Sequence, residues 1–167
     1  DVSVVRYEQK KSNSYVVLGA PAGDDHLGGK DWDEAMVCHI LRKLNIDPDS
    51  IGKHGVVWAT LMREAENRKK ELSKNYQTGF DFQMHEIKEV VPITRSEFET
   101  VSSGLVQRAV KVVEKAIQNA GNPPIDRFVL VGGSSRMPMI RKTLEKKFVH
   151  TISRNRLLED WISLSDP

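Results

Sequence analysis

The chain has little cysteine, no long apolar run and almost no net charge, and each shortage excludes a class of protein. Cys38 is the only cysteine among 167 residues, so no internal disulfide can form and a reducing, cytoplasmic location is expected. No apolar run has the length of a signal peptide or a membrane span. The charged residues sum to +2, which gives no electrostatic reason to expect a nucleic acid or a membrane as partner.

Zinc chemistry is also disfavoured, because the five histidines are scattered and a single cysteine cannot complete a recognisable ligand pair. We therefore expect no bound transition metal. Hydrophobic residues make up 39% of the chain, which is enough for the core of one globular domain, whether undivided or split into two halves.

Hydrophobic periodicity predicts an α/β protein. Alternating residues favour two antiparallel strands joined by a hairpin, and residues repeating every three or four positions favour helices. The expected elements are strands at residues 1–7 and 15–22, a helix of about 14 residues ending near Leu44, a connector at 45–55, a charged amphipathic helix over 56–73, and strands at 80–85 and 89–93 joined by a turn at 86–88.

A capping box marks the next helix. Thr94 can accept from the third helical N–H while Glu97 reaches back to the backbone of Thr94. Gly121, followed by two prolines, ends the helix. Apolar residues step through the interval by three and four, which predicts one continuous helix along the stripe Phe98, Val101, Leu105, Ala109, Val112, Ala116 and Ala120.

Residues 128–131 are typical of a buried parallel strand, and the strand stops at Gly132 and Gly133. Pro138 suits the first turn of a further helix. Glycines let backbone approach a ligand closely, and free N–H groups at a helix start attract phosphate. The segment is therefore typical of a nucleotide-binding turn, although two glycines after a strand are also common as an ordinary turn.

Four stretches together resemble one family. Residues 23–33, 63–73, 93–99 and 129–138 match, in order and spacing, successive signatures of the DnaK or seventy-kilodalton heat-shock chaperones. The resemblance implies the second lobe of an actin-like, ribonuclease H-like ATPase domain. We expect residues 1–28 and 94–167 to form a discontinuous sheet-and-helix half, with residues 29–93 inserted as a smaller α+β lid subdomain.

The resemblance also implies a nucleotide site. Gly28 and Gly29 match glycines near the β-phosphate, and Asp1 matches an acidic residue at the indirect metal and monovalent-ion site. Arg136 matches an arginine that stacks on adenine, an interaction that contributes about 0.5–2 kcal/mol. The remaining matched positions are Gly132, Gly133 and Met137 on the turn side of the nucleoside pocket, and Glu66, Lys69 and Ser73 on the opposite wall.

Simpler interpretations exist for some of these residues. Glu66 and Lys69 stand three apart and could form only a surface ion pair on a solvated helix, worth a few tenths of a kcal/mol. Arg136 could cap a carboxylate. Trp32 is most simply a core residue.

The implied function is that of a chaperone in protein folding and the stress response, which couples ATP binding and hydrolysis to the binding of client peptides. The implied cofactor is ATP or ADP with Mg, which the chain would not need in order to fold. The implied partners are a J-domain co-chaperone and a nucleotide-exchange factor on residues 29–93, with neither nucleic acid nor membrane.

Turnover by the 167 residues alone is not expected. In the family the glycine-rich phosphate loop and its catalytic carboxylate precede the position of Asp1, so we assign no catalytic residue here. Lys30 stands where an acidic residue is usual, and residues 151–165 depart from the family. The alternatives are a hydrolysis-deficient scaffold or an exchange-type relative, and, less favoured, an actin-like filament protein.

Overall fold

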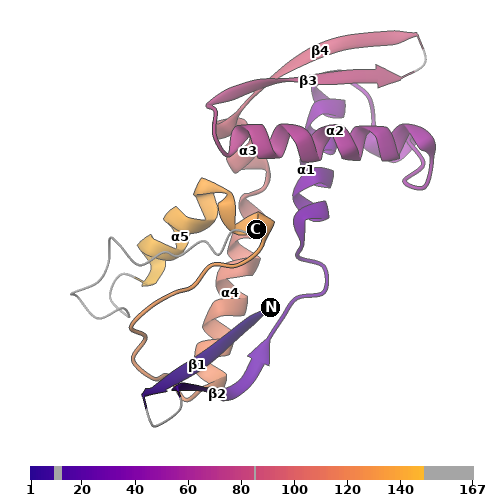
Figure 1. Cartoon of the computed structure of the whole chain (residues 1–167). Coiled ribbons are helices and arrows are strands. Elements are labelled where there is room, and N and C mark those ends of the chain that lie inside the picture. The colour runs from indigo at the N-terminus through magenta and orange to yellow at the C-terminus, as the bar shows by residue number, and fades with distance from the viewer. Residues whose placement is uncertain (10–12, 85, 149–167) are drawn as a thin grey trace.

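The computed structural model describes residues 1–9, 13–84 and 86–148. This section of the chain holds five α-helices and two separate two-stranded sheets (Figure 1). The divergent segment 151–165 lies outside the described residues.

The predicted N-terminal hairpin is confirmed. Strands β1 (Val2–Gln9) and β2 (Asn13–Ala22) pair antiparallel, with Val4 opposite Leu18. The hairpin is hydrogen-bonded to a helix that comes later in the chain. The Asn119 side-chain amide donates to the carbonyl oxygen of Ala20 at 3.0 Å. Gly19 has a φ of +68°, and a Cβ built on it would lie 2.1 Å from the Asn119 carbonyl oxygen, so this contact requires glycine.

The next elements follow the predicted order. Helix α1 (Gly29–Lys43) and the short 3₁₀ turn η1 (Pro48–Ser50) lead to helix α2 (Val56–Leu72). Strands β3 (Gln77–Met84) and β4 (Ile87–Thr94) then pair antiparallel. Because β4 begins at Ile87, the turn predicted at residues 86–88 is shorter than expected.

The core of this region is apolar and continuous. Helix α2 packs against α1 and against β3, where Phe80 is fully buried. Trp32 is buried in this core, as the simpler interpretation of this residue predicted. The buried side chains here are Trp32, Met36, Val37, Ile40 and Leu41 from α1, Trp58, Leu61, Ala65 and Leu72 from α2, and Phe80, Phe82, Val91 and Ile93 from the sheet.

The capping box forms as predicted, but the helix after it is not continuous. The Glu97 N–H donates to Thr94 Oγ1 at 3.2 Å, and Glu97 accepts from the Thr94 N–H at 2.7 Å. The helix breaks at Ser102 into α3 (Arg95–Val101) and α4 (Ser103–Asn119). The buried Ser102 hydroxyl donates to the carbonyl oxygen of Phe98 at 2.6 Å, a local bond that competes with regular helix geometry.

The buried face of α4 also differs from the predicted stripe. The predicted stripe leaves Val101 39% exposed and Leu105 only half-buried. The buried face of α4 instead carries Val106, Val110, Val113, Ala116 and Ile117. The predicted end is right, since Gly121 has a φ of +82° and the Asn122 N–H bonds back to the Ile117 carbonyl.

The predicted strand at residues 128–131 is wrong within the described residues. Residues 126–130 have no strand pairing, and Ile125 and Val131 each form only an isolated bridge. Val129 and Val131 are 52% and 66% exposed. A strand needs a neighbour for its backbone N–H and C=O groups, and no paired strand of the described chain lies along this segment.

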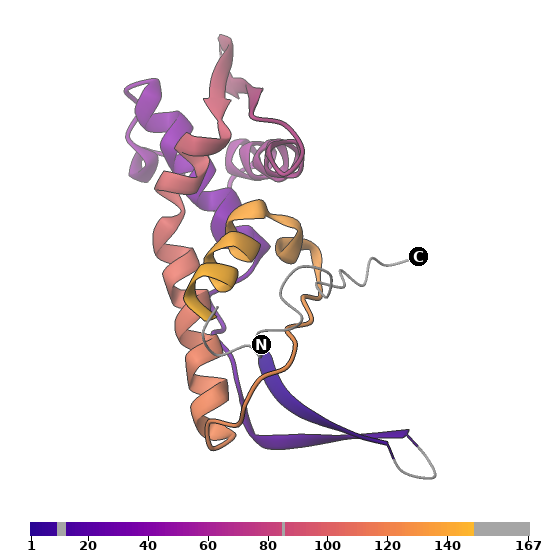
Figure 2. The ribbon, with the colours of Figure 1, turned by 90° about the vertical axis from the view of Figure 1, so that its left-hand side faces the viewer.

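A glycine turn and a helix close the described chain. The turn η2 (Gly133–Arg136) precedes helix α5 (Pro138–Phe148), which starts at the predicted proline. Helix α4 runs along the molecule, with the β1–β2 hairpin at one end and α1, α2 and the β3–β4 sheet at the other (Figures 1 and 2). Residues 29–93 thus lie together, while their division into a separate subdomain stays a prediction.

Candidate functional site

Three segments far apart in sequence meet at Gly29, the first residue of α1. The Lys69 Nζ, from α2, donates to the Gly29 carbonyl oxygen at 2.9 Å. A Cβ built on Gly29 would lie 3.4 Å from Lys69 Nζ and 3.7 Å from the hydroxyl of Ser134 in η2. Gly29 at the start of α1 therefore lies close to both α2 and the glycine turn η2.

The start of α1 already holds a negative charge. Gly28 is the N-cap residue, and its N–H donates to Asp31 Oδ2 at 2.6 Å. A carboxylate is favourable there because the helix dipole places partial positive charge at the N-terminus. A phosphate approaching the Gly28 N–H would have to compete with Asp31.

Lys69 is buried and has a buried partner. Its ammonium lies 2.7 Å from Asp33 Oδ1, and the two residues are only 9% and 5% exposed. Burial raises the pKa of Asp33, because removal from water disfavours the carboxylate, and the nearby Lys69 charge offsets some of that rise. The pair joins α1 to α2 beside Gly29.

The other two residues of the α2 wall have different environments. Glu66 is exposed and pairs with Lys70 at 2.8 Å, a contact that lowers the Glu66 pKa. The half-buried Ser73 donates its hydroxyl to the Lys69 carbonyl oxygen at 3.0 Å. The surface pair between Glu66 and Lys69 is therefore not formed, since each has another partner.

The glycine turn presents one exposed cation. Gly132 has a φ of +94°, a conformation that side chains disfavour, and both Gly132 and Gly133 are open to solvent. Arg136 is exposed, and it makes no hydrogen bond or ion pair with any residue that the structure describes. Its guanidinium caps no described carboxylate. Met137 differs, because its side chain is 3% exposed and packs in the core.

The loop before α1 is tied to α4 by a two-bond ion pair. Arg108 donates from Nε and a terminal nitrogen to the two carboxylate oxygens of Asp24 at 2.9 Å and 2.6 Å. Arg108 lowers the pKa of Asp24. Asp1 is beside the same loop, since a Cβ on Gly23 would overlap its carboxylate.

Asp33, Arg108 and Ser134 did not enter the sequence prediction of the site. Asp33 and Lys69 are 36 residues apart, and Asp24 and Arg108 are 84 apart, so no periodic signal connects them. Ser134 could have been predicted as a site residue from the sequence, because it directly follows the two glycines.

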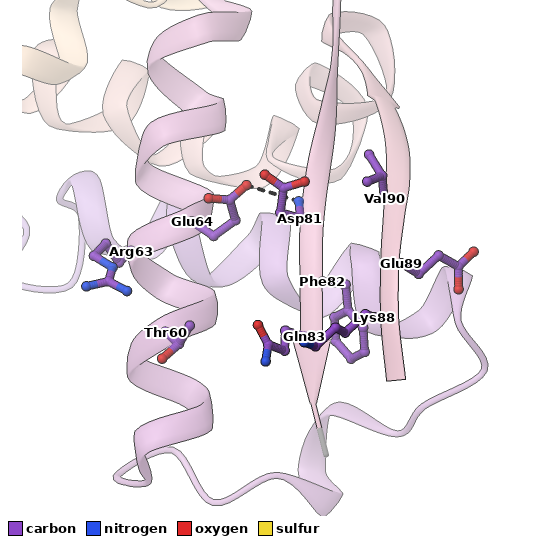
Figure 3. A pocket seen from close by; sticks show the side chains of 9 residues that line it. All are labelled: Thr60, Arg63, Glu64, Asp81, Phe82, Gln83, Lys88, Glu89 and Val90. Atoms are coloured by element: carbon purple, nitrogen blue, oxygen red, sulfur yellow. Dashed lines mark hydrogen bonds between the residues drawn. The ribbon is translucent and has the colours of Figure 1, made fainter. Parts of the chain in front are cut away.

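A second hollow lies on another face, between α2 and the β3–β4 sheet (Figure 3). It is an open cleft of about 410 Å³ with cations and carboxylates intermixed. The dashed bond in Figure 3 joins the Asp81 N–H to Glu64 at 3.0 Å. The lining residues are Thr60, Arg63, Glu64, Asp81, Phe82, Gln83, Lys88, Glu89 and Val90, and none is a predicted site residue.

Comparison with known families gives one match, to the model described as Hsp70 protein, over residues 1–157. The chain belongs to the Hsp70 family. Members of the Hsp70 family are chaperones that bind ATP or ADP with Mg and have an actin-like ATPase fold. The match supports the interpretation that the chain comes from a chaperone ATPase domain, and the family binds nucleotide and client peptides.

Two absences hold for the residues that the structure describes. None of their helices is long and apolar enough to cross a membrane. No group of three or more histidine, cysteine or acidic side chains among them is arranged to hold a metal ion.

Proposed function

We propose that this Hsp70 chain forms the second lobe of the ATPase domain and supplies the nucleoside half of its nucleotide site. The observation that carries the proposal is the meeting of α1, α2 and η2 at Gly29, where Lys69 Nζ and Ser134 Oγ both lie close to the glycine. This places polar groups from both predicted walls around one point at a helix start, where anions are favoured.

Each element has a proposed task. Arg136 stacks its free guanidinium on adenine, and Glu66, Lys69 and Ser73 face the ribose from α2. Gly28 and Gly29 border the phosphates, Gly132 and Gly133 let the backbone approach the ligand, and Asp1 contributes indirectly to the ion site beside the loop at Gly23. Met137 supports the turn from the core rather than touching the base through an exposed side chain.

The 167 residues alone should bind nucleotide weakly and should not hydrolyse ATP. Phosphoryl transfer needs a positioned metal, an attacking water and charge clamps together. With about half of its anchors present, an adenine nucleotide should bind with about −4 to −6 kcal/mol, which corresponds to high micromolar to millimolar Kd. ATP should gain little over ADP.

The test is a chemical-shift titration with adenosine, ADP and ATP. Shifts should centre on Arg136 and Lys69, and Arg136→Ala should weaken binding several-fold. Arg63→Ala is the matched control, because Arg63 is also exposed but lines the cleft of Figure 3. A loss of binding with Arg63→Ala and none with Arg136→Ala would move the site to that cleft and refute the proposal.

In the intact protein we propose that closure of two lobes couples this site to client peptides, with residues 29–93 moving as a lid that a nucleotide-exchange factor contacts. We also propose that a J-domain co-chaperone binds the intact protein. The second candidate is a hydrolysis-deficient scaffold or exchange-type relative, which the occupation of the Gly28 N–H by Asp31 favours. If the full-length protein binds nucleotide but does not hydrolyse ATP, this second candidate is the correct one.

A further inference from the structure

We propose that Asp33 is a positioning residue for nucleotide binding, which holds the Lys69 ammonium at the start of α1 with one donor left for the ligand. The inference rests on the proposed function. It adds a role for a residue that touches no predicted ligand group itself and acts through Lys69.

The donor count supports this role. An ammonium has three N–H donors and no acceptor. Lys69 donates one hydrogen bond, to the Gly29 carbonyl oxygen at 2.9 Å. Its ammonium lies 2.7 Å from Asp33 Oδ1 as an ion pair, so a donor remains for a ligand. A Cβ built on Gly29 would lie 3.4 Å from Lys69 Nζ and 3.7 Å from the Ser134 hydroxyl, so both polar groups border Gly29. A ligand oxygen beside Gly29 is the acceptor that this arrangement fits.

Burial makes the position of Lys69 depend on Asp33. A lysine on an exposed helix face has four flexible side-chain torsions and points into water. Here the ammonium is held between two helices, and a buried charge needs a counter-charge. The carboxylate of Asp33 supplies that charge from α1, the helix that also carries Gly28 and Gly29. Fixing Lys69 therefore also fixes α2 against the predicted phosphate end of the site.

Other charged groups around the pair are few. Glu66 raises the pKa of Asp33 and Lys70 lowers it, both from α2, and each contributes less than Lys69 does. Glu66 and Lys70 are exposed and paired with each other. Ser134 is the group that η2 brings to this point, and it carries no charge.

The experiment compares Asp33→Asn with Glu34→Gln by ADP titration of the 167-residue chain at pH 7.5. Glu34 is the matched control, because it is the next carboxylate on α1 and it pairs with Lys53. Asp33→Asn should weaken ADP binding about threefold to tenfold at pH 7.5, the effect expected when one charge-assisted contact is lost or misplaced. Glu34→Gln should bind ADP as the wild type does.

A double substitution separates positioning from a general structural effect. In a Lys69→Met background, Asp33→Asn should have no further effect on ADP affinity.

A second measurement covers the case in which Asp33→Asn does not fold. The side-chain NMR signal of Lys69 in the wild type, assigned by its loss in Lys69→Met, should shift with ADP and saturate at the same Kd as the backbone signals. The inference is overturned if ADP binds but that signal does not move, or if Asp33→Asn and Glu34→Gln bind ADP alike. A wild type that does not bind ADP refutes the proposed function itself.

Discussion

The capping box at the start of α3 predicts a pH-dependent contribution to stability. Glu97 accepts from Lys43 Nζ at 2.9 Å, from the Thr94 N–H at 2.7 Å and from the Thr94 hydroxyl at 2.8 Å. These contacts, the Lys43 bond first, lower the pKa of Glu97 from its ordinary 4.5 to about 2. Lys43 also donates to the carbonyl oxygen of Pro92 at 2.7 Å, so the cluster joins α1, β4 and α3.

The magnitude follows from the pKa. At about 1.36 kcal/mol per pKa unit, the change from 4.5 to about 2 sets a ceiling near 3.4 kcal/mol. The Glu97 side chain is 36% exposed, and solvent screening at such a site reduces the contribution to about 1–2 kcal/mol.

The sign of the pH dependence follows from the lowered pKa. The carboxylate binds its proton more weakly in the folded chain than in the unfolded chain. Its contribution is therefore complete above pH 4.5 and is lost as the pH falls through the interval from 4.5 to about 2. Glu97→Gln should lower the free energy of unfolding by about 1–2 kcal/mol at pH 7. The difference from the wild type should shrink below pH 4.5.

The assay is urea unfolding at several pH values between 3 and 7, with Glu114→Gln as control. Glu114 has the same 36% side-chain exposure and a lysine partner at 3.0 Å, but no backbone cap. Its substitution should cost at most about 0.5 kcal/mol. Equal costs for the two substitutions, or a Glu97→Gln cost that stays constant down to pH 3, would refute the reasoning.

Three further predictions concern packing and the loop before α1. Gly19→Ala should destabilise the chain by more than about 2 kcal/mol in urea unfolding, because Gly19 has a positive φ and an added Cβ would clash with the Asn119 backbone. The control is Gly104→Ala on α4, where an added Cβ meets no atom within 4 Å, and it should be neutral or stabilising by up to about 1 kcal/mol. Phe80→Ala should cost about 3–5 kcal/mol by calorimetry, since Phe80 is fully buried, and a loss below about 1 kcal/mol would contradict this core. Arg108→Met should accelerate amide hydrogen exchange at residues 24–28 and leave α2 unchanged, because Arg108 holds Asp24 in place; unchanged exchange in that loop would show that the pair does not order it.

Local chemistry determined much of the secondary structure. The Thr94–Glu97 capping box, the left-handed Gly121 and the start of α5 at Pro138 each depend on contacts within a few residues, so the sequence shows them directly. The alternation in the strands and the apolar faces of α1 and α2 are periodic signals of the same local kind. The family resemblance rested on such stretches, and the Hsp70 match agrees with it.

Tertiary structure decided what periodicity cannot express. The predicted helix is interrupted at Ser102, and tertiary packing buries a face of α4 that differs from the predicted stripe. Residues 128–131 have the composition of a strand, but a strand forms only where a second segment supplies backbone hydrogen bonds. Among the described residues, no paired strand includes this segment. Lys69 resembles a surface lysine in a charged run, whereas folding buries it against Asp33, because only the packing of α1 on α2 brings together two charges that are 36 residues apart.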